Sequence, residues 1–479
     1  MATPAVDDPA DIFLASARRL ADEGPALLGL GLRVGDYSDL FLESTGVAIV
    51  VCTQGPTGGP VWKSHERQDE GLGVRIASAE RQGFAWTPAI APHAWSESVA
   101  RAAEQLQQAV GQVAPRPFHS MHWDDLALPP DPPDQLSQLE VRALLQEYAD
   151  AALAADADVT AVEAEFRGTT RRTAVATSEG VFVARATTRI EVRVSVTLGG
   201  VATGFSFRGS CTGFGPLYIE PSEAVALEAL EHARALRAAR PLPAGPYAGV
   251  VAGGWGGVLV HEAIGHALEA DVALGEARSR LKIGTQVAPA SIALFDDPAT
   301  PGRRGSADFD DEGARTGVTT LIEAGQVHAW LADRASSVRW GIPRTGSGRR
   351  QDFRYLPQAR MSNLCLSPGA DSFDSLIHEL ADGLYIRRLG GGRYDARTDR
   401  YTADLVEAYQ IEQGRVAAPV RGGRLVGTGA SLLAGIRGIS NEMDWDAGHG
   451  FCEKKGQIVP IGTAMPALRV DGLTIEPAG

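Results

Sequence analysis

Apolar and polar residues alternate with different periods in successive parts of the chain. In the first part, a helical pattern covers residues 8–23, and an apolar stretch suited to a strand lies near 40–51. An extended stretch near 73–77 then precedes a second helical pattern over 96–110. This order predicts an N-terminal α/β lobe over residues 1–114.

A proline-rich segment follows this lobe. Residues 115–135 contain six prolines, and proline lacks a backbone N–H and fixes φ, so neither a helix nor a central strand can continue there. We interpret the segment as a linker. His119 and His122 lie in it, and a surface role is favoured for them over metal binding.

The pattern after the linker predicts a second lobe over residues 136–240. A helix is expected at 136–155 and another at 222–238. Between them lie four stretches in which apolar residues alternate with polar or small ones, the pattern of an antiparallel sheet. These stretches are residues 159–166, 172–177, 181–196 and 203–210.

A second proline-rich break, at residues 240–246, precedes a C-terminal domain that we place at 241–479. This domain contains many short apolar runs separated by Gly, Pro and Asp, which indicate short strands around one helix. The prediction is a β-rich domain, as a curled sheet or partial barrel. The fold class of the whole chain is therefore α+β.

Composition narrows the function classes. The chain has 479 residues and a net charge of −14, which argues against a nucleic-acid or anionic-membrane partner. No apolar run reaches membrane-spanning length, and the acidic start does not resemble a secretory signal. The cysteines are scattered without a CxxC pair, so no disulfide framework is expected. These features together predict a cytoplasmic protein.

The strongest chemical signal is a histidine, a glutamate and a second histidine within residues 261–266. Two imidazoles and a carboxylate are what a zinc hydrolase needs, as ligands and as a base. His261 and His266 are five positions apart, which separates them by about 140° on a regular α-helix. A π-helical turn near Gly265, which has no Cβ, would bring both rings to one side.

A catalytic zinc needs a third protein ligand, and the residues offer three candidates. Glu269 and Asp271 are close in sequence. Cys452 lies in a polar segment bracketed by glycines, which we interpret as a loop, and Lys454 and Lys455 would help to keep its thiolate ionised. The residues by themselves leave the choice open.

Further motifs follow in a fixed order. They are Leu268-Glu269-Ala270-Asp271, Pro-Gly-Arg-Arg-Gly-Ser at 301–306, Asp-Asp-Glu-Gly at 310–313, Thr-Gly-Ser-Gly-Arg-Arg at 345–350, Arg-Met-Ser-Asn at 360–363, and Cys452 with Gly456 and Gln457. With residues 261–266, they resemble the TldD/PmbA family of zinc metalloproteases, and specifically its TldD branch. The resemblance covers residues 247–477 in order and is weaker in the N-terminal half.

The resemblance implies a Zn²⁺ ion bound by His261, His266 and Cys452, with Glu262 as general base. It also implies a homologous partner subunit of the PmbA branch, TldE, which lacks the metal ligands. The implied substrates are unfolded or extended peptides. The chain departs from the family at Glu453, where the family usually has glycine.

Other residues receive supporting roles. Glu269 and Asp271 are expected to accept a hydrogen bond from the far nitrogen of a ligand histidine. Arg349 and Arg350 could clamp a peptide carboxylate or an oxyanion, although arginines in such loops more often pair with carboxylates of the protein. The peptide is expected to bind as an added strand at a sheet edge.

Two alternatives to a peptidase remain open at this level. One is a zinc amidase that acts on a small molecule, and the other is a non-catalytic subunit that binds peptides.

Overall fold

The computed structural model describes residues 9–110, 137–213, 220–276 and 281–477. The expected linker with His119 and His122 lies outside the described residues. None of the helices in the described ranges is both long enough and apolar enough to cross a membrane.

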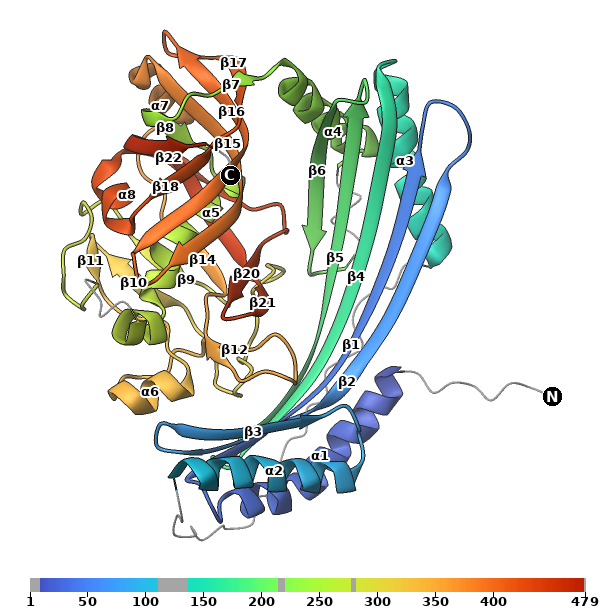
Figure 1. Cartoon of the computed structure of the whole chain (residues 1–479), viewed down its shortest axis with the longest axis vertical. Coiled ribbons are helices and arrows are strands. Elements are labelled where there is room, and N and C mark those ends of the chain that lie inside the picture. The colour runs from blue at the N-terminus through green and yellow to red at the C-terminus, as the bar shows by residue number, and fades with distance from the viewer. Residues whose placement is uncertain (1–8, 111–136, 214–219, 277–280, 478–479) are drawn as a thin grey trace.

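The N-terminal half contains one antiparallel sheet of six strands in the order β3-β2-β1-β4-β5-β6. Its long curved strands stand beside the C-terminal domain in Figure 1. The central pair, β1 and β4, joins the two halves of the sheet over sixteen partner positions. The strands are β1 (Tyr37–Gln54), β2 (Val61–Ser78), β3 (Arg81–Thr87), β4 (Val159–Thr177), β5 (Phe182–Leu198) and β6 (Ala202–Ser210).

Helices cover this sheet at its two ends (Figure 1). At one end lie α1 (Pro9–Gly31) and α2 (Pro92–Val110), and at the other α3 (Gln138–Ala155) and α4 (Ser222–Ala238).

Each end has its own apolar core, and each core takes residues from both sides of the segment expected as a linker. Cys52 of β1 packs in the core beneath α3 and α4, whereas Ala176 of β4 packs in the core beneath α1 and α2. The segments expected as two lobes therefore share one sheet and both of its cores. The boundaries placed at residues 114, 135 and 240 stay predictions.

The C-terminal half contains a sheet of twelve strands. β22 pairs with β8, β8 with β15, β15 with β16, β16 with β18, and β18 again with β22. Because these five strands return to their starting point, they close into a small barrel, and the expected curled sheet or partial barrel is confirmed. The strands of the closed ring are β8 (Gly245–Val251), β15 (Gly383–Asp395), β16 (Arg400–Glu412), β18 (Arg424–Gly427) and β22 (Gly462–Glu476).

Shorter elements extend this sheet or lie around it. The other strands of the sheet are β7 (Arg240–Pro241), β9 (Leu294–Asp296), β10 (Thr319–Glu323), β11 (Gln326–Val327), β14 (Asn363–Leu366), β17 (Arg415–Arg421) and β19 (Ile436–Trp445). Two separate hairpins are β12 (Gly348–Arg349) with β13 (Gln358–Ala359), and β20 (Phe451–Lys454) with β21 (Gln457–Pro460). The short helices are α6 (Arg334–Trp340), α7 (Phe373–Leu380) and α8 (Gly429–Gly435).

A network of buried charges joins the N-terminal sheet to the C-terminal domain. Arg75 of β2 pairs with Asp39 at 2.5 Å and with Glu312 at 2.7 Å, and all three side chains are almost fully buried. Arg171 of β4 lies 3.5 Å from Asp311. Since a buried charge is costly unless paired, this network fixes the segment at 310–313 against the sheet.

A candidate metal centre

The two histidines lie on one helical segment whose winding changes at His261. α5 (Gly257–Val260) is α-helical, η3 (His261–Gly265) is π-helical, and η4 (His266–Leu268) is a 3₁₀ turn. The N–H of His266 donates to the carbonyl of His261, five residues earlier. The two imidazole centroids are 4.8 Å apart, so the wider turn has brought the rings together. The predicted π-helical turn is confirmed.

Glycines allow this segment to lie very close to the neighbouring strands. A Cβ on Gly265 would lie 2.2 Å from Met361 Sδ, and one on Gly257 would lie 2.2 Å from Thr463 Oγ1. Both distances are far below van der Waals contact, so any larger residue would push the segment outward. The lack of a Cβ at Gly265 therefore matters for packing as well as for winding.

Cys452 comes from the hairpin of β20 and β21. The expectation of an irregular loop is wrong here, because Cys452 pairs with Val459 across two short strands. Lys455 and Gly456 form the turn with φ of +50° and +74°, which is the backbone that a tight two-residue hairpin needs. Glu453, where the family usually has glycine, is a strand residue outside this turn, so the departure leaves the hairpin intact.

The hairpin brings the Cys452 thiol to the two imidazoles. Cys452 Sγ lies 3.4 Å from His266 Nε2, and the donor atoms of His261, His266 and Cys452 all lie within 4.8 Å of one another. Tetrahedral zinc with ordinary bond lengths would place a sulfur and a nitrogen ligand about 3.6 Å apart. Both ring nitrogens of His261 are buried, and among the described residues neither has a hydrogen-bond partner. Such an orphaned imidazole is what a missing cation would satisfy, so the donor set fits a zinc ion.

The pKa shifts of Cys452 and His266 also fit a bound cation. Burial opposes ionisation of Cys452, yet the imidazoles of His266 and His261 hold the pKa of its thiol well below the usual range. Burial would lower the pKa of His266, but Cys452 and Glu269 raise it well above its ordinary value. Both shifts favour a positive charge beside a thiolate, and a divalent cation supplies that charge.

Two carboxylates and a lysine form a second layer of contacts around His266. Glu269 Oε2 lies 2.8 Å from His266 Nδ1, which leaves Nε2 directed at Cys452. Lys454 Nζ lies 3.0 Å from Glu269 and donates to Asp271 Oδ1 at 2.6 Å. Lys454 and Lys455 therefore pair with carboxylates, and their expected effect on the Cys452 thiolate stays a prediction. Asp271 contacts these lysines rather than a histidine.

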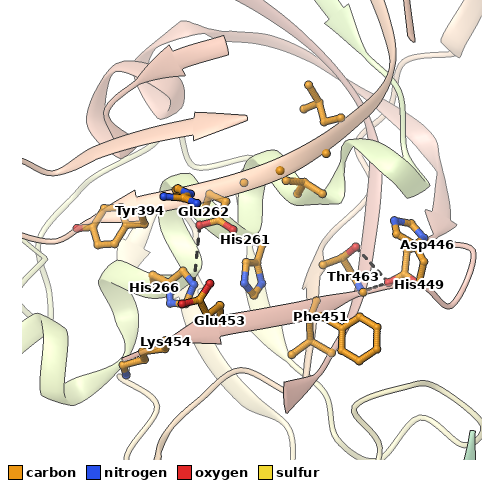
Figure 2. Close-up of a pocket in the computed structure, with 18 of the residues that line it drawn as sticks. His261, Glu262, His266, Tyr394, Asp446, His449, Phe451, Glu453, Lys454 and Thr463 are labelled. Carbon is orange, nitrogen blue, oxygen red and sulfur yellow. Dashed lines mark hydrogen bonds and ion pairs between the residues drawn. The ribbon is translucent and has the colours of Figure 1, made fainter. Parts of the chain in front are cut away.

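A cavity of about 720 Å³ opens onto this group. Figure 2 shows His261, Glu262 and His266 close together in it, with Tyr394 beside them. Glu262 Oε2 is 3.9 Å from His266 Nε2. Burial raises the pKa of Glu262 above its ordinary value, while the two imidazoles act in the opposite direction. The backbone of Gly392 passes so close that a Cβ there would lie 2.6 Å from Glu262 Oε1.

Arg349 and Arg350 are not brought to this cavity. Arg350 is only 1% exposed, stacks on Phe41 and lies 3.5 Å from Asp39. Arg349 donates to the carbonyls of Met361 and Pro460 at 2.6 Å each. Both guanidinium groups contact other groups of the protein, and neither lines this cavity.

Three residues at the site were missed from the sequence. Arg360 is fully buried and donates to the carbonyl of Cys452 at 2.5 Å, which anchors the ligand strand. The ring of Tyr394 lies nearly parallel to that of His266 at 6.2 Å, and His449 stacks on Trp255 at 3.5 Å. Arg360 belongs to one of the sequence motifs, which was the available signal, whereas nothing in the sequence marks Tyr394.

Fold and site together define a class: an α+β protein in which a closed β-ring supports a buried His-His-Cys group fitted to a metal ion. Models of two domains match the chain, the PmbA/TldA metallopeptidase central domain at residues 131–237 and the PmbA/TldA metallopeptidase C-terminal domain at 244–477. The chain belongs to the PmbA/TldD family of metallopeptidases.

Relatives agree with this assignment over most of the chain. A protein of Haemophilus influenzae named metalloprotease TldD homolog is 30% identical over 92% of each chain. A Saccharolobus solfataricus protein named zinc metalloprotease TldD homolog is 31% identical over 48% of this chain and 52% of its own. Among solved structures, TldE from Thermococcus kodakarensis has the same fold, with a TM-score of 0.67 and 17% identity over 97% of this chain and 100% of that one.

Proposed function

We propose that this chain is a zinc-dependent metallopeptidase of the TldD type that cleaves unfolded or extended peptides. The observation that carries the proposal is the convergence of His261, His266 and Cys452 on one point at the wall of an open cavity. Three protein ligands with a fourth position left open is the arrangement of catalytic zinc sites, whereas structural sites use four ligands.

In this proposal His261, His266 and Cys452 hold the ion, and Glu269 orients His266 through its Nδ1. When bound, the zinc ion lowers the pKa of a water molecule and polarises the scissile carbonyl. Glu262 takes the proton of the attacking water and delivers it to the leaving amine. Its burial supports this role, because a raised carboxyl pKa makes the group a better base near neutral pH.

The substrate is proposed to bind as an extended strand along β15. β8 pairs with β15 only at Leu384–Ile386, and residues 389–395 beyond it line the cavity. In the described part of the chain β16 is the only strand paired with this stretch, so its other edge is open to a peptide backbone. Main-chain hydrogen bonds there would select extended chains of varied sequence, which favours a peptide over a small molecule.

We further propose a homologous partner of the TldE type. The likeness of this fold to a solved TldE and the family assignment support it. Size measurement of this chain alone and mixed with such a partner should give a larger species only in the mixture. A complex that never forms would contradict this part of the proposal while leaving the peptidase untouched.

The test begins with metal analysis of the purified protein and cleavage of an unfolded peptide, with and without the partner. Glu262→Gln should retain zinc and lose about 10²–10⁴-fold in turnover, the usual range for a general base. Cys452→Ala should lose both zinc and activity.

Cys365→Ala is the matched control, because Cys365 is also buried but lies in β14 and donates to the carbonyl of Asn363. It should keep zinc and activity. Full turnover by Glu262→Gln would refute the base, and full zinc occupancy in Cys452→Ala would refute the ligand.

A further inference from the structure

A second cavity, of about 180 Å³, lies between β5 of the N-terminal sheet and residues 298–307 of the C-terminal domain. Its lining is unusually rich in guanidinium groups. The arginines are Arg171, Arg185, Arg189, Arg303, Arg304 and Arg349.

Three of these arginines are paired with carboxylates. Arg171 binds Glu43 at 2.9 Å, and Arg185 binds Asp311 at 2.6 Å. Arg304 pairs with Glu191. Their charges are therefore compensated within the protein.

The other three arginines have no carboxylate partner in the described ranges. The guanidinium group of Arg189, a residue of β5, makes neither an ion pair nor a hydrogen bond there. Arg303 stacks on the Trp445 ring at 4.1 Å, and Arg349 donates only to main-chain carbonyls. Burial, with repulsion from Arg304 and Arg171, lowers the pKa of Arg189 to about 10. Three uncompensated positive charges thus face one partly buried space.

Burial and the neighbouring Glu312 raise the pKa of Asp310, the one carboxylate that the described residues contribute to this lining, to about 8, so it adds little negative charge near pH 7. Its two oxygens accept backbone N–H groups of Glu312, Ala314 and Gly348 at 2.8–2.9 Å. A hydroxyl in the lining is also unused: Thr188 Oγ1 is buried without a hydrogen-bond partner in the described part of the molecule.

Uncompensated guanidinium groups are donors that recognise oxyanions, since the guanidinium fork matches carboxylate and phosphate oxygens. We propose that Arg189, Arg303 and Arg349 form an oxyanion site that binds a carboxylate or phosphate group, separate from the metal centre. The anion has two sources to distinguish, a free phosphate and a carboxylate carried by a peptide.

The peptide source has a structural basis. The Arg304 guanidinium donates to the carbonyls of Gly448 and Gly450 at 2.8 Å each, and Gly450 lines the metal cavity. Arg303 and Arg304 also line a smaller cavity that shares Asp446 with the metal cavity. The two sites are therefore neighbours, and an acidic side chain of a bound peptide is a candidate occupant.

The first arm of the test is calorimetric titration of the full chain with inorganic phosphate. Arg189→Gln and Arg303→Gln should each weaken binding about tenfold or more, since each removes charged hydrogen bonds. Arg415→Gln, on the exposed end of β17, is the matched control and should bind as the wild type does. Neither the variants nor this readout depends on peptidase activity.

The second arm compares two peptides of one sequence with Glu or Gln at the same positions, on Glu262→Gln to prevent cleavage. A preference for the acidic peptide that is lost with Arg189→Gln, and competed by phosphate, assigns the anion to the peptide. Equal affinity for both peptides together with phosphate binding assigns it to a free anion.

Two results would overturn the proposal. One is that the chain neither binds phosphate nor prefers the acidic peptide. The other is that the Arg189 and Arg303 variants bind as the wild type does. Thermal unfolding without phosphate checks the fold of the variants. Arg189→Gln should be at least as stable as the wild type there, because it relieves repulsion, and phosphate should stabilise only the wild type. Destabilisation in that buffer would mark Arg189 as structural and would count against the site.

Discussion

Gly265→Ala tests whether close packing of the π-helical turn sets the metal geometry. The backbone at Gly265 is right-handed helical, with φ of −58° and ψ of −51°, so alanine meets no conformational barrier. The new Cβ would lie 2.2 Å from Met361 Sδ and 3.0 Å from Leu364 Cδ2. Both neighbours are buried in the C-terminal core, so the turn or Met361 must move by more than about 1 Å to reach ordinary contact.

Two energies change in the Gly265→Ala variant, the strain of overpacking and the helix propensity of the residue. Overpacking a core costs about 1–3 kcal/mol, and replacing a helical glycine with alanine recovers about 0.5–1 kcal/mol. Without metal, the turn can shift away from β14 and avoid most of this strain. With metal, His266 must stay near Cys452, so the strain falls on the bound state. The gain from alanine is the same with and without metal, so the strain of about 1–3 kcal/mol predicts zinc affinity about 5- to 150-fold weaker.

The assay is competition for zinc against a chromogenic chelator. Gly265→Ala should show the weaker affinity, and adding Met361→Ala should restore it by making room for the new methyl group. Gly275→Ala is the control, since among the described residues its Cβ would meet only Trp340, at 3.5 Å. If Gly265→Ala binds zinc as tightly as the wild type, the packing argument fails.

Three further outcomes are expected. Lys454→Met removes the amine from Glu269 and should weaken zinc binding about 10–100-fold in the same titration, whereas unchanged affinity would show that the carboxylate holds His266 without it. Gly392→Ala crowds Glu262 and should lower kcat about tenfold or more with zinc content unchanged; equal kcat would contradict the close approach. Burial opposes ionisation of Asp311, but Arg171 and its neighbours lower the pKa of this carboxyl to about 2. Since its unfolded pKa is about 3.9, ionised Asp311 should add about 2–3 kcal/mol of stability that is complete above about pH 4 to 5 and lost as the pH falls toward 2. Urea unfolding against pH should show this slope in the wild type and a smaller one in Asp311→Asn, and equal slopes would refute the assignment.

The elements of the N-terminal sheet could be predicted because its strands are long and their apolar faces alternate clearly. Their pairing could not, because residue 39 of β1 lies opposite residue 177 of β4 and no local pattern encodes that register. The C-terminal strands are shorter. The sequence predicted a curled or barrel-like sheet there, but it did not predict where each strand begins and ends. Residues 423–435, for example, are one of the short apolar runs taken as strands, and they divide into β18 and the helix α8, which Thr428 caps.

The site shows the same division between local and distant information. His261, Glu262 and His266 were recognisable because they share one turn, and glycine at 265 indicated how that turn is wound. The place of Arg350 was not recognisable, because its partner Asp39 comes from a strand in the other half of the molecule. A glycine-rich loop around an arginine carries no information on how deeply the arginine will be buried.

The separate sequence motifs form one structural unit in the folded chain. The N–H of Asp311 donates to the carbonyl of Gly348 at 2.8 Å, and the N–H of Arg350 donates to Asp311 Oδ2 at 2.9 Å. The N–H of Arg360 in turn donates to the carbonyl of Ser347 at 2.9 Å. The motifs at 310–313, 345–350 and 360–363 are therefore hydrogen-bonded in series.

This series of hydrogen bonds ends at the proposed metal ligands. Arg360 donates a hydrogen bond to the carbonyl of Cys452. The next residue, Met361, has the side chain against which Gly265 packs. At its other end, Glu312 pairs with Arg75 of the N-terminal sheet. The position of the thiol relative to the imidazoles thus depends on contacts that begin in the other half of the chain. The proposed three-residue metal group can be specified by widely spaced motifs because those motifs supply the residues that support it as well as its three side chains.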